Sequence, residues 1–316
     1  MPKILVTGSV AYDLLLSYDG SFAEAVDPAH LNELSMSFVT PRFSRHHGGT
    51  AANIAWNLRL LNQDPLVVAS VGRDGGEYLA LLEDRKIPTN FMETIPSHAT
   101  PTAIIATDNK ERQITFYHPG ADAHGVWPEK LADERDDIDY AIIAPRDARS
   151  MAEAGEWCKK FGVQYLFDPG QQVLAFEQDA LLKCIGESRG IICNAYEWQL
   201  LSERTGFSTD AILGETHLLI ITHGDEGLSL YTKKENITLP ACKAEKMVNP
   251  TGAGDALRAG IVAGLAAKWT LRQCGQLGAS LASFCVEHEG TLMDKIDVEE
   301  VYARAEGTYG EKLPEL

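Results

Sequence analysis

The chain has 316 residues, 45% of them hydrophobic, and its formal net charge at neutral pH is −17. This acidic charge argues against duplex nucleic acid or an anionic membrane as a partner. The sequence shows no signal-peptide pattern, no apolar run of membrane length and no CxxC spacing among its six cysteines, which predicts a cytoplasmic protein with reduced thiols.

Short apolar runs alternate with helical patterns along the chain. The run Lys3–Thr7 predicts a strand, and Ile54, Leu58 and Leu61 recur at helical spacing within 50–61. Further strands are expected at 66–71, 140–144, 164–167, 190–193 and 217–222, and further helices near 151–161, 175–186, 196–205 and 256–267. This rhythm is typical of βαβ units. We therefore expect one α/β domain over residues 1–316, with a central mostly parallel sheet covered on both faces.

Two pairs of segments depart from this rhythm. Leu14–Ser17 with Leu34–Pro41, and Ala103–Thr107 with Gln113–Tyr117, alternate polar and apolar residues as half-exposed strands do. Asp108–Arg112 joins the second pair and suits a hairpin turn. We expect a small β-sheet lid built from about residues 14–41 and 103–117.

The run Asn249–Asp255 predicts an anion site at the start of a helix. Gly252, Ala253 and Gly254 let their backbone amides point at one anion, and the positive end of the helix dipole adds to the attraction. Asp255 stands at the same end, where its carboxylate would repel a phosphate. A carboxylate in that place is suited to accept the proton of an alcohol that attacks the phosphate. A tight turn is the alternative interpretation.

Three other motifs have both a functional and a structural interpretation. The pair Gly48–Gly49 precedes a helix that carries Asn53, whose amide can bind a substrate hydroxyl or the backbone. Asn194 and Glu197 follow a strand, where they either orient water on Mg²⁺ or cap a helix. The run 222–227 also ends a strand, where it receives a nucleotide or simply turns the chain.

Together these motifs resemble those of the ribokinase-like (phosphofructokinase B) family of sugar and nucleoside kinases over essentially the whole chain. Gly48–Gly49 with Asn53 is similar to the family's N-terminal signature, and Thr251–Asp255 to its C-terminal one. Asn194 with Glu197 matches the family's metal and phosphate motif. The resemblance implies a three-layer ribokinase-like fold, with ATP and Mg²⁺ as cofactors.

Four segments, 8–13, 34–38, 168–172 and 194–198, more closely resemble bacterial adenosine kinases of mycobacterial type. The resemblance implies that Asp13, Gly49 and Asn53 bind the ribose hydroxyls. It further implies that Gln171 and Gln172 lie near the base and that Tyr117 stacks on it. It also implies a homodimer, in which Ser37 reaches the ribose site of the partner subunit. The substrate contacts so expected are Ser9, Asp13, Ser37, Gly49, Asn53, Tyr117, Gln171 and Gln172.

The resemblance also implies the nucleotide site and the catalytic groups. The residues expected along the nucleotide are Asn194, Thr222, His223, Gly224, Gly227 and Thr251. Mg²⁺ is expected near Glu197 and Asn194, held mainly through water. The amides of Gly252, Ala253 and Gly254 are expected to stabilise the transferring phosphoryl group, while Asp255 takes the proton.

The sequence departs from the family pattern at two positions. The family commonly has Asp at the first position of the C-terminal signature, where it helps to hold a monovalent cation, and here the residue is Asn249. Its loss puts activation by K⁺ in doubt. The aromatic residue that closes the second face of the base in the adenosine kinases falls at Ala103, so a purine other than adenosine becomes plausible.

We therefore expect an ATP-dependent kinase that phosphorylates the 5′-hydroxyl of a purine nucleoside, adenosine first, with guanosine, inosine or a sugar as alternatives. A dinucleotide dehydrogenase is disfavoured because GxGxxG is absent, and a non-catalytic nucleoside-binding protein ranks last because Asp255 is present. His46 and His47 are expected to contact the substrate edge or to be structural; a shared metal ion is a third interpretation, although two adjacent side chains rarely face one ion. Arg258 is expected to contact an acid or a phosphate.

Overall fold

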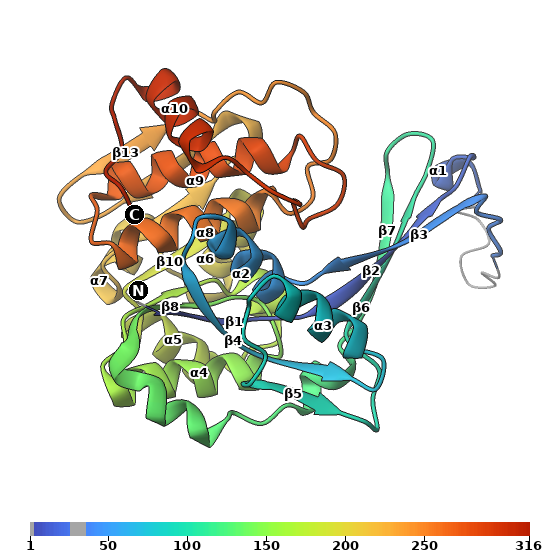
Figure 1. Ribbon diagram of the computed structural model, residues 1–316, viewed down its shortest axis with the longest axis horizontal. Coiled ribbons are helices and arrows are strands. Elements are labelled where there is room, and N and C mark those ends of the chain that lie inside the picture. The colour runs from blue at the N-terminus through green and yellow to red at the C-terminus, as the bar shows by residue number, and fades with distance from the viewer. Residues whose placement is uncertain (1–2, 26–35) are drawn as a thin grey trace.

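The computed structural model describes residues 3–25 and 36–316 (Figure 1). Its body is built on a nine-stranded sheet with the order β13-β12-β11-β10-β9-β8-β1-β4-β5. The strands are β1 (Lys3–Thr7), β4 (Asp64–Gly72), β5 (Met92–Ile95), β8 (Ile138–Ile143), β9 (Tyr165–Phe167), β10 (Gly190–Asn194), β11 (Leu219–Thr222), β12 (Leu228–Tyr231) and β13 (Asn236–Leu239). Every neighbouring pair is parallel except β11–β12 and β12–β13, which confirms the predicted mostly parallel sheet.

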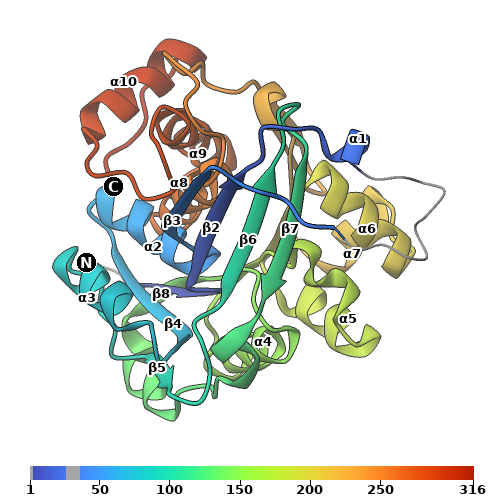
Figure 2. The same ribbon diagram turned by 90° about the vertical axis from the view of Figure 1, so that its right-hand side faces the viewer.

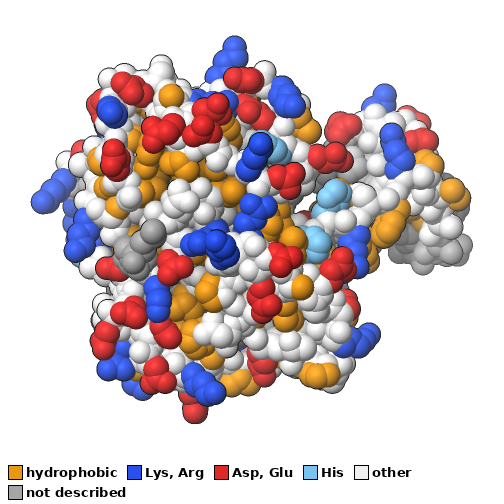
Figure 3. All heavy atoms as spheres, viewed as in Figure 1, with side chains coloured by type: hydrophobic (Ala, Val, Ile, Leu, Met, Phe, Trp, Pro, Cys, Tyr) orange, Lys and Arg blue, Asp and Glu red, His pale blue; other side chains and the backbone are white. Residues whose placement is uncertain are grey.

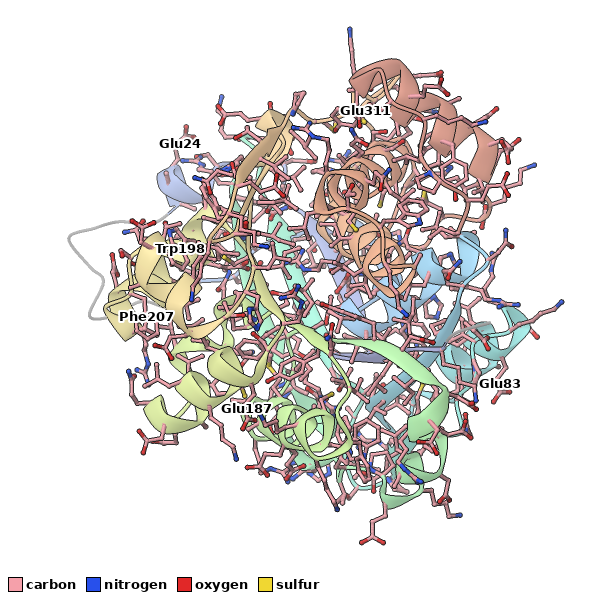
Figure 4. All side chains as sticks on the ribbon, turned by 90° about the vertical axis from the view of Figure 1, so that its left-hand side faces the viewer. Glu24, Glu83, Glu187, Trp198, Phe207 and Glu311 are labelled. Carbon is pink, nitrogen blue, oxygen red and sulfur yellow. The ribbon has the colours of Figure 1, made fainter. Side chains whose placement is uncertain are left out.

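Helices cover both faces of this sheet because its strands are apolar on both sides. On β1, Ile4 and Val6 belong to one hydrophobic cluster, whereas Leu5 belongs to the other. The first cluster includes α2 (Thr50–Leu60), α3 (Gly76–Asp84), α8 (Ala253–Ala266), α9 (Leu271–Cys285) and α10 (Val298–Tyr309). The second includes α4 (Ala148–Phe161), α5 (Gln178–Glu187), α6 (Ala195–Thr205) and α7 (Thr209–Glu215). The labelled acids Glu83, Glu187 and Glu311 point outward from these layers (Figure 4).

A second sheet projects from the body, as Figures 1 and 2 show. Its four strands, in the order β3-β2-β6-β7, are β2 (Ala11–Ser17), β3 (Arg42–Gly48), β6 (Thr102–Thr107) and β7 (Gln113–His118). β2 and β6 are parallel, and each forms an antiparallel pair with an outer strand. At the outer end of the sheet, the carboxylate of Asp108 accepts hydrogen bonds from the amides of Lys110 and Arg112, which closes the predicted hairpin turn.

One predicted strand of the lid is wrong. The partner of β2 is Arg42–Gly48 and not Leu34–Pro41, because Pro41 has no amide hydrogen to donate and the pairing starts directly after it, at Arg42 opposite Ser17. Residues 36–41 contain no strand, and Leu34 and Ser35 lie outside the described residues. Within residues 3–25 and 36–316, no helix has the length and apolarity needed to cross a membrane.

Candidate functional site

The predicted anion site lies where α8 begins. Gly252 precedes the helix with a φ of +87°, a conformation that favours glycine, and no side chain caps the helix. The Ala253 amide donates to the Pro250 carbonyl at 3.3 Å. Asp255 lies in the first turn, and burial raises the pKa of its carboxyl group to about 6. The predicted carboxylate therefore lies at this helix end, whereas the amide of Ala253, one of the three predicted to bind the anion, already has a backbone acceptor.

Asn53 joins the N-terminal signature to this helix. Its Nδ2 atom, on α2, donates to Oδ2 of Asp255 at 2.8 Å, across 202 residues of sequence. The residue is only 4% exposed, and its Oδ1 atom has no hydrogen-bond partner among the described residues. A buried acceptor without a partner is costly, so it suits a hydroxyl donor brought by a ligand. The structure thus adds a contact with Asp255 to the hydroxyl-binding role predicted for Asn53.

Asp13 approaches the same place from the second sheet. A Cβ atom on Gly48 would lie 2.3 Å from Oδ2 of Asp13, and one on Gly49 would lie 2.6 Å from the Ala11 amide nitrogen. Only glycines leave room for these contacts, and Gly49 also has a φ of +92°. Burial raises the pKa of Asp13 to about 6. Nearby, the Thr50 amide donates to Oγ of Ser9 at 3.2 Å.

The strand register places four residues in one row across the small sheet. His46 pairs with Asp13, Asp13 with Ala103, and Ala103 with Tyr117. Because paired residues share a face, Tyr117 and Asp13 lie on the same side of the lid. His47 lies on the other side, where its ring packs 4.5 Å from that of Tyr78. Adjacent histidines therefore do not face one ion. Figure 3 shows histidine side chains beside the notch between lid and body.

Three of the predicted substrate contacts make no hydrogen bond with Asp255, Asn53 or Asp13 in the part of the chain that the structure describes. Gln171 is exposed and Gln172 half-buried on the short helix η4 (Gly170–Leu174), next to β9. Gly170 holds η4 close to Glu197, whose Oε1 atom would lie 3.9 Å from a Cβ at this glycine. Ser37 is exposed in the segment that leads to β3, and no hydrogen bond joins it to another described residue of the site.

Asn194 and Glu197 form a capping box at the start of α6. The Asn194 side chain accepts from the Glu197 amide, and the Glu197 side chain accepts from the Asn194 amide, both at 2.8 Å. Of the two interpretations of this motif, the helix cap is therefore present in the structure. Burial raises the pKa of Glu197. Across the described parts of the chain, no group of three His, Cys, Asp or Glu side chains is placed to hold a metal ion.

A mostly apolar cavity of about 610 Å³ opens beside the start of α8. Four predicted nucleotide contacts, Asn194, Thr222, Gly224 and Gly227, line it. The other two predicted contacts, His223 and Thr251, do not line the cavity. The ring of His223 instead forms a hydrogen bond with Oγ of Ser229 at 3.0 Å. Asp225 and Pro250 also line the cavity, within two of the predicted runs. Lining residues that sequence reasoning missed are Leu228, Ala241, Cys242, Lys243, Ala244, Met247, Leu257, Ala279, Ala282, Ser283 and Val286.

Two further residues of the C-terminal signature have defined partners. Oδ1 of Asn249 accepts from the Thr251 amide at 2.9 Å, so this side chain stabilises the turn before α8. Arg258 donates through Nε to the carboxylate of Asp168, and both residues are buried. Of the two partners expected for Arg258, an acid or a phosphate, the structure shows an acid.

Comparison with known proteins identifies one family profile and several kinases to which the chain is similar. The profile of the pfkB family carbohydrate kinases matches residues 1–296. A nucleoside kinase of Methanocaldococcus jannaschii is 30% identical over 293 residues, which cover 92% of each chain. The solved structure of the Burkholderia thailandensis nucleoside kinase in complex with inosine is 31% identical, with a TM-score of 0.87, and covers 98% of this chain and 99% of that one.

The same Burkholderia kinase in complex with ADP-inosine is 30% identical, with a TM-score of 0.83, and covers 99% of this chain and 98% of that one. These relatives do not bear out the closer resemblance to adenosine kinases of mycobacterial type. The profile match and the shared architecture nevertheless agree with the motifs. The chain belongs to the pfkB family of carbohydrate kinases, has a ribokinase-like fold and is a phosphotransferase that acts on a hydroxyl group.

Proposed function

We propose that the protein is an ATP-dependent kinase that transfers a phosphoryl group to the 5′-hydroxyl of a purine nucleoside. The observation that carries this proposal is the meeting of Asp13, Asn53 and Asp255 at the start of α8, beside the cavity of about 610 Å³. Two carboxylates and an amide oxygen without a partner match a ligand rich in hydroxyl groups. The nucleoside kinases among its relatives support the same substrate class.

In this proposal Asp255 accepts the proton of the attacking hydroxyl. Charge in a phosphoryl transfer spreads over the transferring oxygens, so positioning and electrostatic stabilisation carry the catalysis. The amides of Gly252, Ala253 and Gly254 lie at the positive end of α8 and suit that charge, and the Ala253 amide would exchange its 3.3 Å bond to the Pro250 carbonyl for one to the phosphoryl group. Asn53 fixes the carboxylate through its Nδ2 atom and offers Oδ1 to a sugar hydroxyl.

The apolar cavity suits the nucleoside part of ATP, and the open helix end beside it suits the phosphates. Glu197 and Asn194 cap α6 with one oxygen each, so any Mg²⁺ near them is held mainly through water and phosphate oxygens. When bound, Mg²⁺ neutralises phosphate charge. Asn249 bonds the Thr251 amide and offers no carboxylate, which supports turnover without K⁺.

The identity of the base is the finer part of the proposal. Adenosine was expected from the sequence, whereas inosine is the nucleoside in the structures of the Burkholderia relative. Tyr117 offers one aromatic face and its neighbour Ala103 offers none. Gln171 and Gln172 carry amides that can donate or accept, so they accommodate either a 6-amino or a 6-oxo purine. We place both purines within the proposed substrate class.

We also propose a homodimer formed through the lid. Paired register places Phe43, Leu16, Ala106 and Ile114 in one row and Arg45, Leu14, Ile104 and Phe116 in the next, on the face opposite Asp13. Arg45, at the β3 end of its row, is the one charged residue of these two rows. Phe43, Ile114 and Phe116 are exposed. A second copy of this face would cover it, since apolar sheet faces pack against each other. The reach of Ser37 into the partner's site and the cytoplasmic location stay predictions from the sequence.

The test is a substrate panel. The protein is mixed with Mg-ATP and, separately, adenosine, inosine, guanosine, ribose or fructose, while ADP release is followed. We expect turnover with one or more purine nucleosides and little with the free sugars. Turnover with ribose or fructose alone would make the protein a sugar kinase and overturn the proposal.

Two controls sharpen the panel. ATP alone should be hydrolysed slowly, because a lid that closes on the nucleoside excludes water from the site only when the nucleoside is bound. A large ATPase rate without nucleoside would contradict the proposed role of the lid. Replacing Na⁺ in the buffer with K⁺ should change the rate by no more than about twofold. Asn249 lacks the carboxylate that would attract a monovalent cation to this place.

A further inference from the structure

Arg258 folds back over the first turn of α8 toward the predicted anion site. Side chains on a helix lean toward its N-terminus, so the guanidinium of Arg258 lies one turn before its own backbone. A Cβ atom on Gly254 would lie 2.8 Å from Nη1 of Arg258. The guanidinium therefore packs directly against the turn that carries the predicted phosphate-binding amides, and a side chain at position 254 would displace it.

A cation in this place is electrostatically unusual. The first turn of a helix favours anions, and burial of a charge is costly unless a partner compensates it. Arg258 is 9% exposed. Asp168, which is 0% exposed and follows β9, supplies the partner by accepting from Nε of Arg258. Oδ1 of Asp168 also accepts from the Gly170 amide at 3.2 Å, so the anchor is itself fixed.

The surroundings of Asp255 give this pair a consequence beyond packing. The groups that face its carboxylate come from six places in the fold: Asn53 on α2, Asp13 on β2, Tyr78 on α3, Asp168 after β9, Arg258 on α8 and Cys285 on α9. Among these groups Arg258 is the one cation. Glu197 on α6 faces Arg258 in turn. The arginine is thus shared between Asp255 and the acids on the nucleotide side.

We propose that Arg258, anchored by Asp168, is a positioning residue of the phosphoryl transfer, which holds Asp255 as an ionised base and packs the Gly254 turn against it. The inference rests on the proposed function, in which Asp255 is the base. It predicts that the two members of one ion pair act on the base in opposite directions. Loss of the arginine charge weakens the ionised form of Asp255, whereas loss of the Asp168 charge strengthens it.

The experiment is a set of pH profiles of kcat with saturating Mg-ATP and the best nucleoside of the panel. The acid limb of the profile for the unmodified protein is expected near pH 6, where Asp255 takes up a proton. Arg258→Met should move that limb upward by about one pH unit or more, which lowers kcat about tenfold near the limb and lets it recover at alkaline pH. Arg258→Lys, which keeps the charge, should leave the limb nearly unmoved. Asp168→Asn should move it downward.

The matched control is Arg59→Met. Nη1 of Arg59 lies 3.7 Å from Oδ1 of Asp64 at the amino end of β4, so this variant also breaks an arginine–aspartate pair but does so at the C-terminal end of α2, the end opposite to Asn53. Its profile should match that of the unmodified protein. Arg258→Met leaves Asp168 buried without its partner, so the double variant Asp168→Asn/Arg258→Met is made in case the single variant does not fold. Its acid limb should lie between those of the two single changes.

The outcomes separate the inference from the proposed function. If both single variants lower kcat equally at every pH while the acid limb stays in place, the pair is only structural and the inference is wrong. If Arg258→Met raises the KM for ATP without moving the limb, the guanidinium acts on the nucleotide and the inference is again wrong. Activity that survives Asp255→Asn would instead overturn the proposed base, whatever the profiles show.

Discussion

The two sheets differ in what covers their apolar side chains. In the nine-stranded sheet, Ile4 and Val6 on one face and Leu5 on the other are buried under helices. In the four-stranded sheet, Phe43 is 63% exposed and Phe116 is 64% exposed. A covered sheet fixes the position of what stands at its edge, whereas an uncovered sheet has surface left for a ligand or a partner. Within the proposed function, this contrast assigns the positioning of catalytic groups to the body and the binding of ligand and partner to the lid.

The candidate site draws on both sheets. Asp255 and Asn53 start from helices that pack on the covered sheet, and their mutual hydrogen bond is 2.8 Å long. Asp13 and Tyr117 stand on the lid, in one row of its register. We therefore expect changes in the body to affect the rate of the chemical step, and changes in the lid to affect binding and assembly. The predictions below test this division.

The largest effect should come from the body. Asp255→Asn keeps the side-chain volume and an oxygen that can accept from Asn53, but it removes the group that takes the proton. We expect kcat to fall by about 10³-fold, a typical contribution of a positioned general base, with the Kd for the nucleoside nearly unchanged. Rapid-quench kinetics and equilibrium binding measure the two quantities. Turnover within tenfold of the unmodified protein would contradict the role of Asp255.

The next effect concerns the uncovered face of the lid. Phe116→Ser removes an exposed aromatic ring from each of two copies, so the Kd of the proposed homodimer should rise about 100-fold, at 1–2 kcal/mol for each ring. Sedimentation over a range of concentrations measures this Kd. Thr115→Ser, which alters the neighbouring residue on the other face of β7, is the control and should leave it unchanged. A protein that is monomeric before the change contradicts the proposed dimer.

A smaller effect is expected on the ligand-facing side of the lid. Tyr117→Ala removes the ring proposed to stack on the base, so the KM for the nucleoside should rise about tenfold, while kcat changes much less. Initial rates at varied nucleoside concentration separate the two constants. A tenfold fall in kcat with no change in KM would instead mean that Tyr117 acts in the chemical step. That result would contradict the proposed assignment of catalysis to the body and binding to the lid.

Local sequence signals predicted much of this fold. The turn at Gly252, the start of α8 and the capping box of Asn194 with Glu197 all depend on residues within four positions of one another. The apolar runs predicted the covered strands because their side chains are buried on both faces. The partner of β2 was misplaced because strand pairing is not local, and the alternation near Pro41 did not indicate where pairing starts.

The contacts that complete the site are all long-range. Asn53 and Asp255 are 202 residues apart in the sequence, and Arg258 and Asp168 are 90 apart. No spacing rule relates such positions. The sequence therefore predicted that Asn53 binds a substrate hydroxyl or the backbone, without its contact to Asp255, and could not decide whether Arg258 contacts an acid or a phosphate. The α9 wall of the cavity was missed for a different reason. Ala279 and Ala282 are small apolar residues, typical of any buried helix, and only their place beside α8 makes them a cavity wall.

The smallest predicted effect is a gain. Ala103 lies between Asp13 and Tyr117 in the register of the lid and is half-buried, so a larger side chain there extends the aromatic surface beside Tyr117. Ala103→Phe should lower the Kd for the nucleoside about fivefold, equivalent to about 1 kcal/mol of aromatic contact, with little change in kcat. Ile104→Phe, on the opposite face of β6, is the matched control and should leave the Kd unchanged, although it enlarges the face proposed for the dimer. Isothermal titration with both variants decides the matter: equal gains, or a gain with Ile104→Phe alone, would mean that the row from His46 to Tyr117 does not face the base.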